Sequence, residues 1–216
     1  MKQRDVFLGS EGDAWFQRNP SAVQAAEFPQ SDPLLFQLVE MFPQPVAGTR
    51  VLEIGCGDGA RLEWLKLHRD FECYGVEPSA QAVEAARRRG IRAEQGTAEQ
   101  LPFEAAAFDI VLFGFCLYLC DREDLFRIAS EADRVLRNPG WLLILDFYAP
   151  TFTSRDYRHR AGVCSHKMDY RTLFTWHPGY ACYVQKVAHH ATHGLTDEPD
   201  EWIATSVLRK NPKLSE

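Results

Sequence analysis

The sequence predicts an α/β fold in which helices cover both faces of a mostly parallel sheet. Short apolar segments at 50–54, 108–115 and 141–147 lack the polar alternation of half-exposed strands, so each is predicted to be a strand buried on both faces. A segment of helical length separates successive strands, which is typical of parallel strands joined by crossover helices. Two further strand patterns, at 179–191 and 201–211, predict an antiparallel hairpin at one edge of the sheet.

The predicted helices of the first half carry start and stop signals. The helix at 31–42 opens with Asp32, a possible N-cap, followed by a proline at the first helical position. The helix at 79–90 can be capped by Ser79 and is stopped by Gly90. The other elements predicted in this half are a helix and two strands, at 59–68, 71–77 and 91–96.

The second half continues the alternation and then changes in character. Asp121 is expected to cap an amphipathic helix over 121–136, and the sequence NPG is expected to turn the chain into the next strand. Residues 149–178 are aromatic and basic and are predicted to be irregular. Since no linker is visible, we expect one domain with N-terminal cap helices, a core, and a substrate-side insert with the hairpin, at 1–47, 48–148 and 149–216.

The composition excludes several classes of protein. Of the 216 residues, 45% are hydrophobic and 25% are charged, as in soluble globular proteins. A net charge of −6 argues against a general surface for nucleic acid or anionic membrane. The six cysteines form no CxxC pair, which predicts reduced thiols in the cytoplasm. No signal-peptide pattern and no long apolar run is visible, so we expect a soluble cytoplasmic protein, with its oligomeric state left open.

The segment VLEIGCGDGA, at 51–60, carries the first functional signal. Gly55, Gly57 and Gly59 follow an apolar strand at every second position, and Glu53 precedes them. Such a turn exposes main-chain N–H groups and lets a ligand approach the backbone at the carboxyl end of a parallel strand. The spacing differs from the G-x-G-x-x-G of nicotinamide and flavin sites.

This E-x-G-x-G-x-G pattern resembles the first motif of the class I S-adenosylmethionine (SAM)-dependent methyltransferases. Three later features match that family in order and spacing: Glu77 at the end of the second strand, GTAEQLPF at 96–103, and LRNPGWLLILDF at 136–147. The family usually has an acid where this chain has Thr97. The resemblance covers about residues 48–148.

The resemblance implies a Rossmann-like sheet of seven strands, SAM as the cofactor, S-adenosylhomocysteine as the product and a small molecule as the substrate. It implies that the glycine turn cradles the methionine tail and that Glu77 binds the ribose hydroxyls. Glu53 would lie beneath the turn, where it holds the loop or meets the ammonium group through water. The cofactor residues implied in this way are Glu53, Gly55, Cys56, Gly57, Gly59, Glu77, Pro78, Thr97, Ala98, Glu99, Phe113 and Gly114.

Methyl transfer from a sulfonium depends strongly on alignment and desolvation, but an oxygen nucleophile still needs a base. Asp146 ends the fifth strand and is either a base or an anchor for a loop. Tyr118 follows the fourth strand and is expected as a wall of the site more than as an acid or base. His159 and His166, in the irregular segment, are either bases or solvent-facing residues.

Two side-chain clusters invite further hypotheses. His189, His190 and His193 lack the glutamate of a zinc helix, and strand alternation separates the first two, so no metal is expected. A basic and aromatic cluster suggests an anionic, ring-containing substrate such as a nucleotide sugar, unless its cations only pair with surface acids. It comprises Arg155, Tyr157, Arg158, Arg160, Lys167, Tyr170, Arg171, Phe174 and Trp176.

The N-terminal segment at 7–22 contains Trp15 and Phe16 ahead of the main fold. Members of the family often carry a leading helix that closes over SAM, and this segment also resembles the start of methyltransferases from bacterial sugar-modification pathways.

Other functions remain open at this level. The sequence FGFCLY at 113–118 lacks the N/D-P-P-Y of enzymes that methylate amino groups of nucleic acids. A protein methyltransferase and a SAM-binding sensor without catalysis are alternatives. A nicotinamide dehydrogenase is disfavoured by the glycine spacing.

Overall fold

The structure of the chain is a computed structural model, and it describes residues 2–19 and 29–211. Residues 1, 20–28 and 212–216 lie outside the described residues, so parts of the expected N-terminal and C-terminal regions are not covered.

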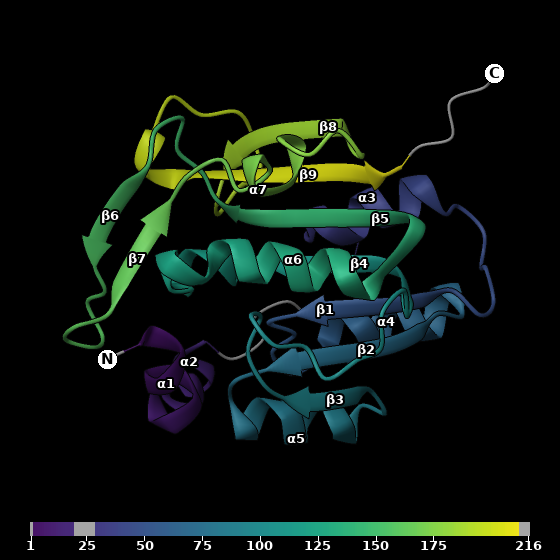
Figure 1. Cartoon of the computed structure of the whole chain (residues 1–216), viewed down its shortest axis with the longest axis horizontal. Helices are drawn as coiled ribbons and strands as arrows, with labels where there is room; N and C mark the ends of the chain where they lie inside the picture. The colour runs from purple at the N-terminus through teal and green to yellow at the C-terminus, as the bar shows by residue number, and fades with distance from the viewer. Residues whose placement is uncertain (1, 20–28, 212–216) are drawn as a thin grey trace.

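Seven strands form one sheet in the order β3-β2-β1-β4-β5-β9-β8 (Figure 1). The first five strands of that order are parallel, and β9 runs antiparallel to both β5 and β8. The bounds of the strands are Arg50–Ile54 (β1), Glu72–Glu77 (β2), Arg92–Gln95 (β3), Phe108–Gly114 (β4), Leu136–Phe147 (β5), Tyr180–His189 (β8) and Trp202–Lys210 (β9). The predicted mostly parallel sheet with an antiparallel pair at one edge is therefore confirmed.

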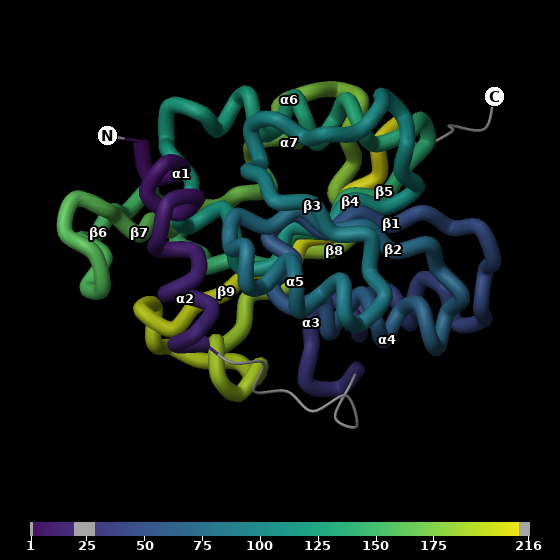
Figure 2. The backbone as a smooth tube through the Cα atoms, turned by 90° about the horizontal axis from the view of Figure 1, so that it is seen from below, coloured from purple at the N-terminus to yellow at the C-terminus, as the bar shows by residue number. Residues whose placement is uncertain are grey.

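Helices cover both faces of this sheet, as Figure 2 shows with α3, α4 and α5 on one side and α6 and α7 on the other. Their bounds are Pro33–Met41 (α3), Ala60–Arg69 (α4), Ala80–Arg88 (α5), Leu125–Val135 (α6) and Thr172–Thr175 (α7). Each layer has its own apolar core. Leu35, Leu62 and Val83 pack beneath one face, and Ile128 and Phe174 pack on the other.

The helix starts that the sequence predicts at Asp32 and Ser79 are confirmed. The Asp32 carboxylate accepts hydrogen bonds from the N–H groups of Leu34 and Leu35 at 2.9 and 3.0 Å. The Ser79 hydroxyl accepts one from the N–H of Ala82 at 3.1 Å. Both side chains thus satisfy N–H groups that the first turn of a helix leaves without a partner.

Three local predictions are wrong. A short 3₁₀ turn, Arg122–Asp124, precedes α6, and Asp121 makes no side-chain cap to it. The NPG sequence lies inside β5, which begins at Leu136. Within 149–178, a hairpin and a helical turn replace the expected irregular chain; the hairpin strands are Thr153–Asp156 (β6) and Cys164–Lys167 (β7). Short strands built from polar residues gave no apolar pattern to detect.

The N-terminal helices and the β6–β7 hairpin lie together at the carboxyl edge of the parallel strands (Figure 1). The N-terminal elements are Gln3–Val6 (α1), the π-helical turn Phe7–Glu11 (η1) and Gly12–Arg18 (α2). Val6 and Phe7 pack on Val163 of the hairpin. The carboxyl edge of the parallel strands is therefore covered by the N-terminal helices and by a hairpin from the second half of the chain.

Among the described residues, no helix has the length and apolar character needed to cross a membrane.

Candidate functional site

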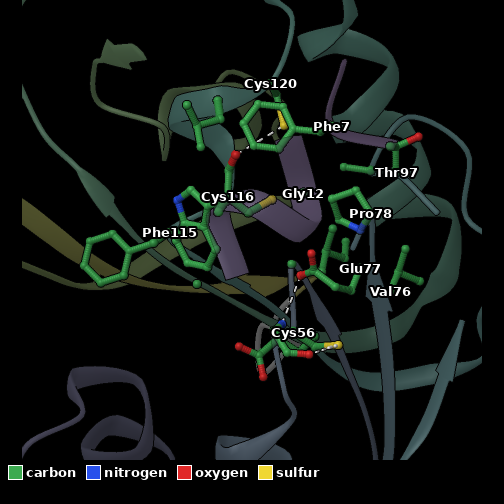
Figure 3. Close-up of a pocket in the computed structure, with 18 of the residues that line it drawn as sticks. Phe7, Gly12, Cys56, Val76, Glu77, Pro78, Thr97, Phe115, Cys116 and Cys120 are labelled. Atoms are coloured by element: carbon green, nitrogen blue, oxygen red, sulfur yellow. Dashed lines mark hydrogen bonds between the residues drawn. The ribbon is translucent and has the colours of Figure 1, made fainter. Parts of the chain in front are cut away.

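A cavity of about 380 Å³ opens at the carboxyl ends of β1, β2 and β4, beneath the N-terminal helices (Figure 3). Its volume falls within the range of roughly 300–1,000 Å³ found for small-molecule sites. Ligands of open parallel sheets bind at this edge, where the loops after successive strands meet. Pro78 and Thr97 lie at one side of the cavity and Phe115 at the opposite side.

The glycine turn forms the floor. Gly55, Gly57 and Gly59 have φ values of 76°, 53° and 74°, which lie in a region that residues other than glycine rarely adopt. A Cβ on Gly55 would lie 2.6 Å from the Cβ of Cys116, whereas a Cβ on Gly57 would meet nothing within 4 Å. Gly55 is thus required for packing, and the open space above Gly57 leaves the main chain accessible to a ligand.

Glu53 lies under this turn and is 1% exposed. One of its oxygens, Oε1, forms an ion pair with Arg61, which also contacts Asp32 at 2.9 Å. The other oxygen, Oε2, is buried and has no hydrogen-bond partner among the described residues. Burial raises the pKa of Glu53 to about 7, against the opposing effect of Arg61. An acceptor that is buried without a partner is costly, which indicates a ligand with a hydrogen-bond donor here.

Glu77, at the end of β2, connects the glycine turn to the next helix. One carboxylate oxygen accepts the N–H of Gly57 at 3.0 Å, and the other accepts the N–H of Ser79 at 3.1 Å. Burial raises the pKa of Glu77, and these two backbone N–H groups oppose that shift. Each oxygen retains a second lone pair, so the carboxylate can still accept two hydroxyl groups from the cavity side.

The far end of the cavity is polar and tied to the N-terminus. The hydroxyl of Thr97 donates to Glu99 at 2.6 Å, and the Arg4 guanidinium contacts the same carboxylate at 3.2 Å. The Thr97 hydroxyl therefore holds the Glu99 carboxylate at this end of the cavity.

The N-terminal helices form the roof. Asp13 of α2 accepts hydrogen bonds from the Ser79 hydroxyl at 2.6 Å and from the N–H of Gln81 at 3.1 Å. The Trp15 indole N–H donates to the hydroxyl of Tyr118 at 3.3 Å. These bonds hold α2 over the cavity, whose lining includes Trp15 and Phe16.

Most of the cofactor residues implied by the sequence lie on the cavity wall. Those that line it are Glu53, Gly55, Cys56, Gly57, Glu77, Pro78, Thr97, Ala98, Glu99 and Gly114. Gly59 and Phe113 are outside this lining. A Cβ on Gly59 would lie 3.1 Å from Ala86, so that glycine serves the packing of α4 on α5. Phe113 is fully buried beside Phe174 in the core.

The candidate catalytic residues from the two central strands have structural partners. Asp146 is 2% exposed, and its carboxylate accepts the N–H groups of Leu117, Tyr118 and Phe147. These bonds tie it to the turn after β4. Tyr118 packs edge-on against Phe147, with ring centroids 5.0 Å apart, and is not among the residues that line the cavity.

The two histidines proposed as bases lie on the β6–β7 hairpin and its tip. His159 is exposed, and its Nε2 accepts a hydrogen bond from Arg158 at 3.0 Å. His166 is buried against Phe152, and its Nδ1 has no partner among the described residues. Burial, assisted by the nearby Arg122, lowers the pKa of His166 to about 4. Neither histidine lines the cavity.

Three cations of the basic cluster bind acids or carbonyls of this chain. Arg155 pairs with Asp200 at 2.6 Å, Arg171 pairs with Asp169 at 2.8 Å, and Lys167 contacts the carbonyl oxygen of Asp200. Arg158 and Arg160 lie at the tip of the hairpin. Neither has a carboxylate oxygen of residues 2–19 or 29–211 within 4.0 Å, so neither forms an ion pair with the described part of the chain.

Sequence reasoning missed three residues that line the cavity: Arg61, Phe115 and Arg4 of α1. Arg61 is the first cation after the glycine turn, and a carboxylate buried at the end of β1 requires such a partner. That requirement could have pointed to Arg61 from the sequence. Phe115 and Arg4 gave none, because their position depends on how distant segments pack.

The cavity suits an adenosyl amino acid such as SAM. The unpartnered Glu53 oxygen can receive an ammonium group, and the open space above Gly57 leaves room for a carboxylate beside the turn. Glu77 can take a ribose, and Thr97 and Ala98 line the end where a flat base would lie. The arrangement therefore agrees with the cofactor that the sequence implied.

Fold and cavity together define a Rossmann-like α/β protein with a cavity of ligand size at the carboxyl edge of the sheet. Residues 52–144 match the family model described as a methyltransferase domain. Over that segment, somewhat less than half of the chain, the sequence is similar to a methyltransferase domain.

Curated relatives match a limited segment. The uncharacterized methyltransferase YcgJ of Bacillus subtilis is 37% identical over 109 residues, which are 47% of this chain and 42% of that protein. The fatty-acid O-methyltransferase of Mycolicibacterium smegmatis is 37% identical over 106 residues, or 47% of this chain and 38% of that protein. The chain therefore spans about two fifths of the length of the curated relatives it matches.

Solved structures share the fold over most of the chain. The 1,6-didemethyltoxoflavin-N1-methyltransferase of Burkholderia thailandensis, solved with its heterocyclic ligand and S-adenosylhomocysteine, has a TM-score of 0.66 at 18% identity. That alignment covers 97% of this chain and 87% of the other. The YcgJ structure gives a TM-score of 0.60 at 19% identity, covering 83% of this chain and 98% of the other.

Proposed function

We propose that this protein transfers a methyl group from SAM to a small-molecule acceptor. The observation that carries the proposal is the unpartnered Oε2 of Glu53, a residue that lines the cavity beside the glycine turn, while Glu77 lies at the end of the next strand. The cavity thereby offers an acceptor for an ammonium group, open space beside the glycine turn for a carboxylate, and an acceptor for a diol. SAM contains all three matching groups.

The residues of the chain would act by binding, aligning and excluding water. Glu53 binds the ammonium group, and Arg61 keeps Glu53 in place through its ion pair. Glu77 binds the ribose and keeps the glycine turn attached to α5. Trp15 and Phe16 cover the cavity and exclude water. When bound, SAM supplies an activated methyl group, so alignment and desolvation account for much of the rate.

The acceptor class follows from the surroundings of the cavity and from the names of relatives. A fatty acid and a toxoflavin precursor are the small molecules named for two of them. The narrower hypothesis of an anionic ring-containing metabolite, such as a nucleotide sugar, depends on Arg158 and Arg160, because the other cations of the cluster are engaged. We further propose that the protein acts in the cytoplasm and does not bind nucleic acid.

Calorimetric titration of the whole chain with SAM, S-adenosylhomocysteine and NAD tests the cofactor. Binding of the first two in the micromolar range and no binding of NAD is the expected result. Labelled SAM with phenolic, amine, nucleotide-sugar and peptide libraries then tests the acceptor. Binding of SAM with no turnover on any library would favour a sensor without catalysis, and turnover on peptides alone would favour a protein methyltransferase.

A further inference from the structure

Four rings gather beside the cofactor cavity, at the ends of β4, β5 and β8. The ring centroids of Phe115 and Phe147 are 5.3 Å apart, and that of Tyr118 lies 5.0 Å from Phe147. The His190 ring lies 5.3 Å from Phe115 and 5.1 Å from Phe147. We refer to Phe115, Tyr118, Phe147 and His190 as the aromatic face. Offset and edge-on contacts at these distances are favourable for ring systems.

Phe115 joins this face to the cofactor cavity, since it also lines that cavity. Its φ is 52°, a conformation that bulky side chains rarely adopt. The Phe115 N–H donates to the carbonyl oxygen of Leu145 at 2.8 Å, which fixes the backbone just before the strained turn. Backbone strain of this kind is concentrated at functional sites. The conformation directs an aromatic ring to the side of the cavity opposite Pro78 and Thr97 (Figure 3).

His190 differs from the other six histidines, all of which lie in the described part of the chain. It alone has a ring contact with a residue that lines the cavity. His177 and His189 use Nδ1 to accept backbone N–H groups, and His159 accepts from Arg158. The His190 imidazole has no hydrogen bond to any described residue, and His190 is exposed. Both ring nitrogens are therefore available to an incoming ligand.

We propose that the aromatic face is the acceptor site, that it binds a small planar ring compound bearing an O–H or N–H group, and that His190 is the catalytic base. This inference rests on the proposed methyltransferase function and names its acceptor class. A planar ring would stack against Phe115 and Phe147, so that its nucleophilic atom lies on the Phe115 side of the cofactor cavity.

His190 takes the proton that the acceptor loses as its oxygen or nitrogen bonds to the methyl carbon. The bond from that carbon to sulfur breaks with its electron pair left on sulfur. The positive charge of the sulfonium is thus replaced by that of an imidazolium, and no other reactant is needed. Such a base needs to be neutral near pH 7.

The surroundings of His190 lower its pKa, which favours the neutral form. Although the residue is exposed overall, partial desolvation of its ring lowers the pKa, the Glu201 carboxylate raises it, and the nearby His193, His189 and Lys167 lower it. These groups come from β7, from the end and following turn of β8, and from the 3₁₀ turn before β9. The backbone N–H of His190 donates to the carbonyl oxygen of Glu201 at 2.8 Å, which holds the histidine close to that turn.

Binding can be tested without knowledge of the natural acceptor. The full chain is saturated with S-adenosylhomocysteine, and ligand-observed saturation-transfer NMR is recorded with phenol, 4-hydroxybenzoate, benzimidazole and methyl glucoside. We expect the planar probes to bind and Phe147→Leu to weaken them at least tenfold. His177→Gln, a histidine away from the cavity, is the matched control. The neutral and anionic planar probes distinguish a neutral acceptor from an anionic one.

The role of the base is tested separately with His190→Gln. The imidazole signals of His190 should shift on addition of a planar probe, and their titration gives its pKa directly. With an active planar acceptor, kcat/KM of the unchanged protein should decrease at pH values below the pKa of His190. His190→Gln should have a kcat at least tenfold lower and should no longer show this decrease at low pH. The variant should still bind the probes.

Two outcomes would overturn the inference. One is that the complex with S-adenosylhomocysteine binds no planar probe, whether or not it binds methyl glucoside. The other is that His190→Gln keeps the full rate and the same pH profile. In either case the binding of SAM and S-adenosylhomocysteine remains intact, so the proposed methyltransferase function stands. Failure of that function is recognised separately, by the absence of cofactor binding.

Discussion

The Asp121 carboxylate caps a helix that begins 118 residues earlier in the chain. It accepts the N–H of Gln3 at 2.9 Å and the N–H of Arg4 at 3.0 Å. In the other direction, the Gln3 amide group donates to the carbonyl oxygen of Leu119 at 2.7 Å. The turn after β4 and the first N-terminal helix therefore form one hydrogen-bonded unit at the entrance of the cavity.

Asp121→Ala should release α1 from this unit. Loss of an N-cap typically costs about 1 kcal/mol, so amide hydrogen exchange in residues 3–18 should become roughly fivefold faster. Exchange in the central strands should stay unchanged. Asp197→Ala, in an exposed loop, is the control. Equal protection of residues 3–18 in both variants would contradict the capping role.

Glu77→Ala should weaken the binding of S-adenosylhomocysteine at least tenfold, which corresponds to about 1.4 kcal/mol. The substitution removes the ribose acceptor and the two bonds to Gly57 and Ser79. Glu72→Ala, at the exposed start of the same strand, is the matched control and should bind normally. Calorimetry on the three proteins gives the comparison, and unaltered affinity of the Glu77 variant would remove the basis of the proposed cofactor site.

The affinity for S-adenosylhomocysteine should rise between pH 6 and pH 8, because the Glu53 carboxylate binds an ammonium group only when it is ionised. Burial raises the pKa of Glu53 to about 7, so ionisation is completed over that interval. Glu53→Gln should bind more weakly and lose this dependence on pH. Calorimetric dissociation constants at several pH values provide the measurement, and an identical slope in both proteins would show that another group is responsible.

Asp146 should make the free energy of unfolding depend on pH. Its pKa in the folded state, about 7, lies above the ordinary value of 3.8, so the folded state holds the proton more tightly. Stability due to this group is therefore present at low pH and is lost as the pH rises from 3.8 to about 7. Denaturant unfolding of the unchanged protein should show a decrease of a few kcal/mol at most.

Asp146→Asn lacks the titrating proton, so its free energy of unfolding should depend less on pH. Glu53 also has a raised pKa and contributes a pH dependence of the same sign. A double variant with Glu53→Gln separates the two contributions. If the profile of Asp146→Asn follows that of the unchanged protein, the titration belongs to another residue.

Phe113→Leu should reduce stability and leave cofactor affinity unchanged. The ring is fully buried against Phe174 and does not line the cavity. Replacement by the smaller side chain should cost about 1–2 kcal/mol in urea unfolding. A selective loss of S-adenosylhomocysteine binding, with stability unchanged, would place Phe113 in the site after all.

The features that local sequence could predict were those with local causes. The strand at 108–115 and the caps at Asp32 and Ser79 follow from apolar runs and from short polar side chains at helix starts. The glycine turn and Glu77 follow from the backbone and hydrogen-bonding needs of a ligand at a strand end. These signals lie within a few residues of the structure that they specify.

The features that could not be predicted depend on contacts between distant segments. Asp121 has the residue type and position of a cap for the following helix, yet its carboxylate is taken by Gln3 and Arg4. His190 was considered only as a metal ligand, because its place beside Phe115 and Phe147 results from the pairing of β8 at the sheet edge. Tertiary packing decides the role of such residues.

The position of β9 has a consequence for synthesis of the protein. β9 lies between β5 and β8, although both of those strands precede it in the chain. Until the ribosome has released residues 202–210, the edge of β5 has no partner and its apolar strand is open to other chains. A nascent chain stalled before that point should therefore need a chaperone, and truncation ahead of β9 should yield insoluble protein.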